Sequence, residues 1–317
     1  MSQKTALVTG ATGLLGRQVL DAFERANWNV VGQGFTRGEP PKIQRANLEV
    51  KQEVEELLDR VRPQVVVHCA ANRFPDKCDA NPTQARSLNI EATRSLSHAT
   101  SSRSIFLIYI STDYVFPGTP GEAPYPASAP TNPPNLYGET KRDGENVILE
   151  SAGGSGVVLR VPVLYGQAES RAESAVNVLV DSVWKAQEPG ARPIKMDDWA
   201  KRYPTNTEDV GRVCHDIAVK YLSHTPPERE SQLPKILQFS SEDCMTKYEI
   251  CEMFAEILGL PLEGGMERNK VGNEPGAAVQ RPFDTHLGTG ELRALGINVV
   301  TQDFKAWWRR ELHAVRR

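Results

Sequence analysis

The stretch KTALVTGATGLLGR, residues 4–17, decides the fold of this chain. Within it, residues 5–9 form a short apolar run that predicts a β-strand, and residues 14–27 predict a helix. The turn between them carries a glycine at every third position, at Gly10, Gly13 and Gly16. Glycine lets the chain turn sharply, lets the backbone approach a pyrophosphate and lets the helix pack closely on the strand. We therefore expect a dinucleotide site with its phosphates at the helix N-terminus; a plain tight turn is the alternative.

Length and charge limit the classes of protein to consider. The chain has 317 residues, 39% of them hydrophobic, so it can bury a large core as one α/β unit or as a domain with a smaller lobe. The 37 basic and 40 acidic residues leave a net charge of −3, which argues against a nucleic-acid or membrane-surface binder. Apolar runs such as residues 105–110 are too short to span a bilayer, and no signal peptide follows Met1. We expect a cytoplasmic protein, with the nucleus as a further location.

The cysteines predict neither disulfides nor a metal site. Five of them are scattered without a Cys-x-x-Cys pair, at Cys69, Cys78, Cys214, Cys244 and Cys251. An odd, scattered set is typical of free thiols in a reducing compartment, so no metal is expected. His68 lies inside an apolar run and is expected to be a hydrogen-bonded core residue rather than a base or a ligand.

The residues after the second expected strand, 28–32, bear on the choice of cofactor. A fold that prefers NAD places an acidic residue near this point to bind the ribose hydroxyls. No acidic residue appears here before Glu39, whereas Arg37, and Arg17 after the third glycine, could neutralise a 2′-phosphate. We therefore expect NADP(H) in preference to NAD; the alternative is that both arginines are solvated surface residues.

Strands and helices then alternate along the first half of the chain. Strands are expected at residues 64–71, 104–111 and 156–161, and helices at residues 54–61 and 81–102. Apolar, β-branched strands alternating with helices indicate a doubly wound parallel sheet with right-handed crossovers. Small side chains at Ala70 and Ala71 would let a cofactor cross the end of one strand. Residues 117–134 form a long Pro- and Gly-rich loop of the kind that is usually functional or mobile.

The chemistry-bearing residues flank that loop. Tyr137 and Lys141 are four residues apart on an expected helix and share a face. A neighbouring ammonium would lower the pKa of the tyrosine, so that the phenol could exchange a proton near neutral pH. A hydroxyl of Ser111 or Thr112, at the end of the preceding strand, could polarise a carbonyl substrate. An ordinary surface helix is the alternative.

Three motifs carry a family resemblance. TGATGLLG (9–16), STDYVFPG (111–118) and NLYGETK (135–141) resemble the extended short-chain dehydrogenase/reductase proteins of the dTDP-4-dehydrorhamnose reductase type. Within that group the chain is more specifically similar to the regulatory beta subunits of methionine adenosyltransferase, over nearly its whole length. The stretches that decide this are residues 10–17, 27–28, 31–35, 67–71, 196–199, 202–205, 245–249 and 280–282. The resemblance implies a Rossmann-type NADP(H)-binding protein that associates with the methionine adenosyltransferase catalytic subunit and modulates S-adenosylmethionine synthesis.

The motifs and the resemblance together imply specific site residues. The expected cofactor-binding set is Gly10, Thr12, Gly13, Leu14, Leu15, Gly16, Phe35, Arg37, Asn47, Leu48, Cys69, Ala70, Ala71, Asn89, Ile110, Tyr137, Lys141 and Val163. If the protein is an enzyme, the catalytic set is Thr112, Tyr137 and Lys141. The expected substrate-facing set is Asp113, Trp199, Arg202 and Arg281.

Two other functional interpretations of the same residues are left open. The intact Thr112, Tyr137 and Lys141 are compatible with an active NADPH-dependent reductase of a 4-keto sugar nucleotide. Residues 283–286, Phe-Asp-Thr-His, depart from the reductase form, which leaves recognition of a sugar-nucleotide-like ligand open. An epimerase or dehydratase is a weaker reading, because a dehydratase needs an acid pair that Asp113 alone does not supply.

The second half predicts a smaller C-terminal lobe. We expect a Rossmann domain at residues 1–165 and a substrate or partner lobe at 166–317, with residues 205–240 packing back on the first domain. Helices are expected at residues 174–184, 207–222 and 246–258, a strand at 235–239, a polar loop at 224–233 and a flexible segment at 263–276. Residues 305–317 combine adjacent tryptophans with basic residues, and either reach a partner or pack on their own domain.

Overall fold

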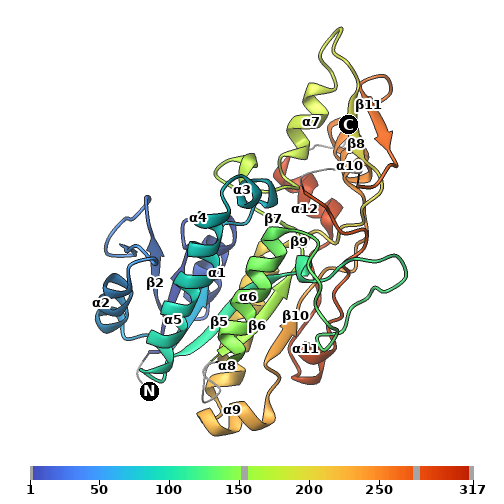
Figure 1. Ribbon diagram of the computed structural model, residues 1–317. Coiled ribbons are helices and arrows are strands. Elements are labelled where there is room, and N and C mark those ends of the chain that lie inside the picture. The colour runs from blue at the N-terminus through green and yellow to red at the C-terminus, as the bar shows by residue number, and fades with distance from the viewer. Residues whose placement is uncertain (1–2, 151–155, 274–278, 314–317) are drawn as a thin grey trace.

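A seven-stranded parallel sheet forms the centre of the protein (Figure 1). The computed structural model describes residues 3–150, 156–273 and 279–313. The strand order is β10-β6-β5-β4-β1-β2-β3, so the order reverses between β1 and β4. The strands are β1 (Thr5–Thr9), β2 (Asn29–Gly34), β3 (Ile43–Arg45), β4 (Val65–His68), β5 (Phe106–Thr112), β6 (Gly156–Val161) and β10 (Ile236–Gln238). The predicted doubly wound sheet is confirmed, and its switch point between β1 and β4 is where such folds bind ligands.

Different helices cover the two faces of the sheet. Ala6 and Val8 of β1 point to one side and share a core with α1 (Leu14–Arg25) and α8 (Thr207–Leu222). Leu7 points to the other side, into a core with α2 (Lys51–Val61), α5 (Ala92–Ser101) and α6 (Leu136–Glu150). Figure 1 shows α5 and α6 in front of the sheet. Side chains alternate along a strand, so a continuously apolar strand can bury both of its faces in this way.

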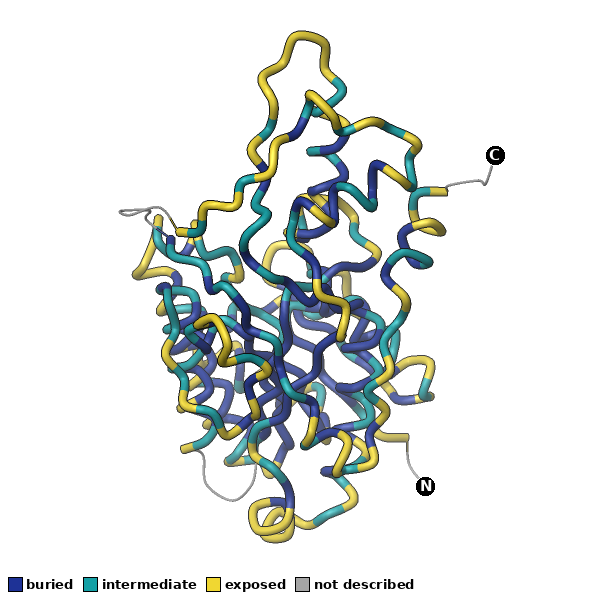
Figure 2. The backbone as a smooth tube through the Cα atoms, turned by 90° about the vertical axis from the view of Figure 1, so that its right-hand side faces the viewer, coloured by how far each residue is buried: buried dark blue, intermediate teal, exposed yellow. Residues whose placement is uncertain are grey.

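A second layer of structure lies beyond the carboxyl ends of the strands, at the top of Figure 1. It contains α7 (Leu179–Lys185), α10 (Lys247–Leu258), α12 (Phe304–Glu311) and the parallel pair β8 (Ile194–Asp197) and β11 (Met266–Asn269). A second short pair joins β7 (Leu164–Tyr165) to β9 (Thr205–Asn206), and α11 (Gly290–Ala294) lies near β10. Figure 2 shows buried residues running through the sheet layer and a smaller buried group in the upper layer. The division at residue 165 stays a prediction, while α8 packs on α1 and β10 extends the sheet.

The helix expected over residues 81–102 is interrupted, and a further helix precedes it. The segment consists of α3 (Pro75–Ala80), α4 (Pro82–Arg86), one π-helical turn (Ser87–Glu91) and α5. Asn81 leaves the helical conformation because it precedes Pro82, which disfavours that conformation. Its side chain then caps α4, since the Gln84 N–H donates to Asn81 Oδ1 at 3.2 Å.

Other boundaries also differ from expectation. The predicted loop at 224–233 contains α9 (Pro226–Gln232), which begins with a capping box between Thr225 and Glu228. The helix expected at 207–222 has these bounds in α8, and Asn206 caps it, because the Glu208 N–H donates to the Asn206 side chain at 2.9 Å. The helix expected from residue 174 begins at Leu179. The segment predicted to be flexible contains β11, while its residues 274–276 lie outside the described part of the chain.

The C-terminal tryptophans pack on their own protein. Trp307 and Trp308 are 5% and 1% exposed, and both rings contact Tyr165. Of the two alternatives, packing on the chain's own domain therefore holds for these two side chains; residues 314–317 lie outside the described part of the chain. No helix in residues 3–150, 156–273 or 279–313 is both long enough and apolar enough to cross a membrane.

Candidate functional site

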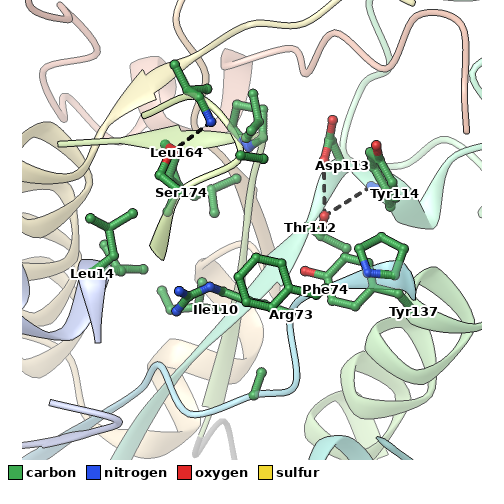
Figure 3. A pocket seen from close by; sticks show the side chains of 18 of the residues that line it. Leu14, Arg73, Phe74, Ile110, Thr112, Asp113, Tyr114, Tyr137, Leu164 and Ser174 are labelled. Atoms are coloured by element: carbon green, nitrogen blue, oxygen red, sulfur yellow. Dashed lines mark hydrogen bonds between the residues drawn. The ribbon is translucent and has the colours of Figure 1, made fainter. Parts of the chain in front are cut away.

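A pocket of about 290 Å³ opens between the strand ends and the second layer (Figure 3). One wall is the glycine-rich turn, a second is the end of β5 with the start of α6, and a third comes from the segment after β7 and from α10. The site is thus built from segments far apart in the sequence, which the parallel sheet brings to one edge.

The glycine-rich turn has the geometry that an anion requires. Gly10 adopts a φ of +62°, in the left-handed region that favours glycine. A Cβ on Gly16 would lie 2.2 Å from the Gly10 carbonyl oxygen, so only glycine fits there. No side chain caps the start of α1, where Gly13 is the N-cap, so the first N–H groups of the helix are available to a ligand.

Most of the predicted cofactor residues meet at this pocket. Those that line it are Gly10, Gly13, Leu14, Leu15, Gly16, Cys69, Ala71, Ile110, Tyr137, Lys141 and Val163. Those that are not among its lining residues are Thr12, Phe35, Arg37, Asn47, Leu48, Ala70 and Asn89. Asn89 instead holds the loop after β4, because its side chain accepts from the Asn72 N–H at 2.8 Å and donates to the Asn72 carbonyl at 3.0 Å. His68 is a satisfied core residue, as expected, with ring nitrogens 2.7 Å and 3.1 Å from threonine hydroxyls.

Several lining residues were not predicted. They include Arg73, Phe74, Glu173, Ser174, Lys247 and Ile250. Arg73 stacks on Phe74, with 4.9 Å between the guanidinium carbon and the ring centroid, and Figure 3 shows both within the pocket. Arg73 could have been found, because it lies five residues after β4, a strand whose carboxyl end faces the site. No local pattern marks Glu173 or Lys247 as a pocket residue.

Burial controls the ionisation of Tyr137 and Lys141. Burial raises the pKa of Tyr137 above its usual range, although a hydrogen bond with Thr112 acts to lower it. Burial lowers the pKa of Lys141 to about 7, with the charge of Glu145 opposing the change, and its ammonium nitrogen lies 4.0 Å from the Tyr109 ring centroid. The expectation of a lowered Tyr137 pKa is therefore wrong, because removal from water raises it and Lys141 is not among the groups that shift it.

The two hydroxyl groups at the end of β5 both donate hydrogen bonds to carboxylates. Thr112 donates to Asp113 Oδ1 at 3.0 Å and accepts from the Tyr114 N–H at 3.2 Å, as the dashed lines of Figure 3 show. Asp113 also accepts from Thr285 at 2.5 Å, and burial raises the pKa of Asp113 against these hydrogen bonds. Ser111 donates to Glu145 at 2.5 Å.

A buried ion pair supports this wall of the pocket. Glu145 and Arg160 are each 2% exposed and form a bidentate pair at 2.7 Å and 2.9 Å. Arg160 also donates to the Ala127 carbonyl and to Gln238 of β10. Because every charge in the group is paired, it can stay buried while it ties the loop at 117–134 to the sheet.

The far end of the pocket is positively charged. Arg202 lines it and is 6% exposed; its Nη1 donates to the Lys201 carbonyl, while its Nη2 has no hydrogen-bond partner among the described residues. Burial and the charges of Arg202 and Arg281 lower the pKa of Lys247 to about 8. Arg281 pairs with Asp76 at 3.1 Å. Of the predicted substrate-facing residues, Asp113, Arg202 and Arg281 line the pocket; Trp199 is not among the lining residues and packs on Phe283.

Comparison with known proteins places the chain in a family. The family described as RmlD substrate binding domain matches residues 4–315. Methionine adenosyltransferase 2 subunit beta of Rattus norvegicus is 39% identical over 94% of this chain and 84% of its own length. The chain belongs to both families. The subunit beta protein of Danio rerio is 38% identical over 95% of this chain and 88% of its own length.

The relatives that are named as enzymes are more distant from this chain than the subunit beta proteins are. A dTDP-4-dehydrorhamnose reductase of Streptomyces griseus is 37% identical, over half of each chain. The solved dTDP-4-dehydrorhamnose reductase of Bacillus anthracis in complex with NADP superposes with a TM-score of 0.79, at 19% identity and 99% coverage of both chains. The UDP-glucose 4-epimerase of Thermus thermophilus with NAD gives 0.77, at 19% identity and 96% coverage of both. At such identities the two structures establish the shared fold alone.

Proposed function

We propose that this protein is a regulatory subunit of methionine adenosyltransferase, which binds NADP(H) and modulates S-adenosylmethionine synthesis by binding the catalytic subunit. The observation that carries the proposal is the 39% identity, over 94% of the chain, to a protein named as subunit beta of that enzyme. The relation covers both layers of the fold and is not limited to the dinucleotide motif. We also propose a reducing compartment, the cytoplasm or the nucleus, because all five cysteines are free thiols.

The residues at the pocket fit a nicotinamide dinucleotide. The N–H groups beside Gly13 suit its pyrophosphate, Arg37 suits a 2′-phosphate, and Tyr137 with Lys141 suits the nicotinamide ribose. When bound, such a cofactor supplies a transferable hydride. A preference for NADP(H) over NAD is inferred from Arg37 and from the lack of an acidic residue directly after β2.

The ionisation of Tyr137, though not that of Lys141, favours binding over catalysis. Proton transfer near neutral pH requires a group whose pKa lies near that pH, and burial moves the pKa of Tyr137 the other way. The Thr112 hydroxyl donates to Asp113, which competes with any carbonyl for its hydrogen. Neither feature changes the residues that would bind a cofactor.

A binding assay tests the regulatory role. The full chain is mixed with the methionine adenosyltransferase catalytic subunit and examined by size-exclusion chromatography with light scattering, with and without NADP⁺. We expect a stable complex and a changed rate or KM for S-adenosylmethionine formation. Separate elution of the two proteins at micromolar concentrations, with unchanged kinetics, would overturn the proposal.

A reductase acting on a 4-keto sugar nucleotide is the second candidate. It is favoured by Arg202, a buried arginine that lines the same pocket as Thr112. Its Nη2 has no hydrogen-bond partner among the described residues and lies 3.7 Å from Asp197 Oδ2, so the guanidinium can still bind an anionic ligand. The test follows NADPH oxidation with a dTDP-4-keto-6-deoxy sugar in the wild type and in Tyr137→Phe. Turnover that the substitution abolishes would support this candidate; equal inertness of both proteins would eliminate it.

A further inference from the structure

Residues 166–174, which follow β7 and include the short 3₁₀ helix Arg171–Glu173, lie beside the glycine-rich turn. Two glutamates of this segment meet two arginines of the nucleotide-binding layer. We call Arg17, Arg37, Glu169 and Glu173 the Arg–Glu cluster. Its carboxylates come from more than 130 residues further along the chain than its guanidinium groups.

The contacts of the cluster are unequally buried. Arg17 forms a bidentate pair with Glu173 at 2.5 Å and 3.3 Å, and these side chains are 21% and 15% exposed. Arg37 pairs with Glu169, and these side chains are 49% and 56% exposed. Both arginines also donate to the Thr12 carbonyl, at 2.6 Å and 2.7 Å, within the glycine-rich turn. The Arg17–Glu173 pair is therefore a fixed support, whereas the Arg37–Glu169 pair is open to solvent and to exchange of partners.

The exposed pair involves the arginine that suits a 2′-phosphate. Arg37 lies three residues beyond the end of β2, where a dinucleotide fold places the group that recognises the adenosine ribose. A phosphate monoester carries a charge of about −1.5 to −2 at pH 7. A phosphate bound by Arg37 would share one guanidinium with the Glu169 carboxylate, and the two anions would repel each other. NAD lacks this phosphate and would not encounter the competition.

We infer that Glu169 is a specificity-determining residue, which weakens binding of the 2′-phosphate by competing for Arg37 and so narrows the preference for NADP over NAD. This inference rests on the proposed dinucleotide site. The carboxylate contacts Arg37 and Arg17, and neither it nor Arg37 is among the lining residues of the pocket, so its charge is expected to act at the 2′-phosphate end of the dinucleotide. Glutamine at this position keeps the size and the hydrogen-bonding oxygen of the side chain but removes its charge.

Isothermal titration of NADP⁺ and NAD⁺ into the full chain tests the role of Glu169. The proteins are the wild type, Glu169→Gln, Arg37→Gln and the double variant, with thermal melts to show that each is folded. The matched control is Asp181→Asn, which breaks the Arg171–Asp181 pair of similar exposure beside the same segment. We expect Glu169→Gln to tighten NADP⁺ binding about two- to fivefold, within what an exposed ion pair allows, and to leave NAD⁺ binding unchanged. In the Arg37→Gln background the substitution should have no effect, and Asp181→Asn should match the wild type.

The outcomes separate the inference from the proposed function. If Glu169→Gln leaves NADP⁺ binding unchanged, weakens it, or alters the binding of both dinucleotides equally, Glu169 has no role in specificity, although the cofactor site stands. If the gain persists without Arg37, competition for that guanidinium is excluded. If the folded wild type binds neither dinucleotide at millimolar concentration, the cofactor site itself is wrong and the inference falls with it.

Discussion

Burial makes the charged form of Lys141 unfavourable at the pocket. In the folded chain burial lowers its pKa from 10.5 to about 7, so the folded state binds this proton more weakly than the unfolded state does. This difference lowers the free energy of unfolding. The loss is complete below about pH 7 and disappears as the pH rises towards 10.5. The residue is thus held in place at a cost in stability, which is typical of groups kept for binding or chemistry.

We predict that Lys141→Met stabilises the protein at neutral pH while it weakens dinucleotide binding. Methionine fills similar space without a charge, so the free energy of unfolding should rise by on the order of 2–4 kcal/mol at pH 7. The gain should shrink as the pH rises towards about 10, where the lysine is neutral in both states. Urea unfolding across this pH range measures the gain in the free energy of unfolding. A gain that does not depend on pH would show that burial of the charge is not the cause.

At the scale of elements, the turn between β1 and α1 does most to shape the site. The helix begins so close to the strand that the Gly10 carbonyl lies where a side chain on Gly16 would stand. This close approach directs the first N–H groups of α1 into the pocket beside Leu14 and Leu15. The same closeness makes the turn intolerant of even a methyl group.

We predict that Gly16→Ala abolishes dinucleotide binding and destabilises the fold by about 1–3 kcal/mol, as overpacking does. The new Cβ would meet backbone atoms of Gly10 and Ala11 at 2.2–2.8 Å, which cannot yield without moving the turn. Gly290→Ala is the matched control, because a Cβ at Gly290 would meet no atom within 4 Å. Thermal melts and titration with NADP⁺ provide the measurement; a Gly16→Ala variant that binds as the wild type does would contradict the assigned role of the turn.

At the scale of the whole molecule, Tyr165 connects the sheet to the second layer. It follows β6 closely, and its ring contacts Phe304, Trp307 and Trp308 of α12 at centroid distances of 4.8–6.0 Å. The C-terminal helix therefore stabilises the layer that supplies Lys247 and Ile250 to the pocket. This explains why its tryptophans are unavailable as anchors for a partner.

Removing the aromatic ring of Trp308 should destabilise the second layer. We predict that Trp308→Ala lowers the free energy of unfolding by about 3–5 kcal/mol, the usual loss for a buried aromatic side chain. Trp184→Ala removes the same side chain from a site that is 49% exposed and should have little effect. Chemical denaturation of both variants tests this, and equal losses would indicate that the burial of Trp308 contributes nothing specific.

Much of the fold and part of the site could be predicted from local sequence. The strand, glycine turn and helix at the N-terminus, the alternation of strands and helices and the placement of Tyr137 beside Lys141 all follow from short-range periodicity. Short elements such as β3, β11 and α9 were missed, because three or four residues carry little periodic signal or because a proline suggested a loop. The bounds of α8 agree with the prediction, whereas α7 begins at Leu179 and not at residue 174.

The sequence by itself determined that a doubly wound parallel sheet forms and which turn lies at its ligand-binding edge, since those features depend on neighbouring residues. Only the tertiary structure decided that Glu169 meets Arg37 and that Thr285 meets Asp113, across 132 and 172 positions. It also decided the ionisation of Tyr137 and Lys141, because a pKa depends on how far distant segments exclude water from the group. Long-range contacts and desolvation arise from packing of the whole chain, and no local pattern encodes them.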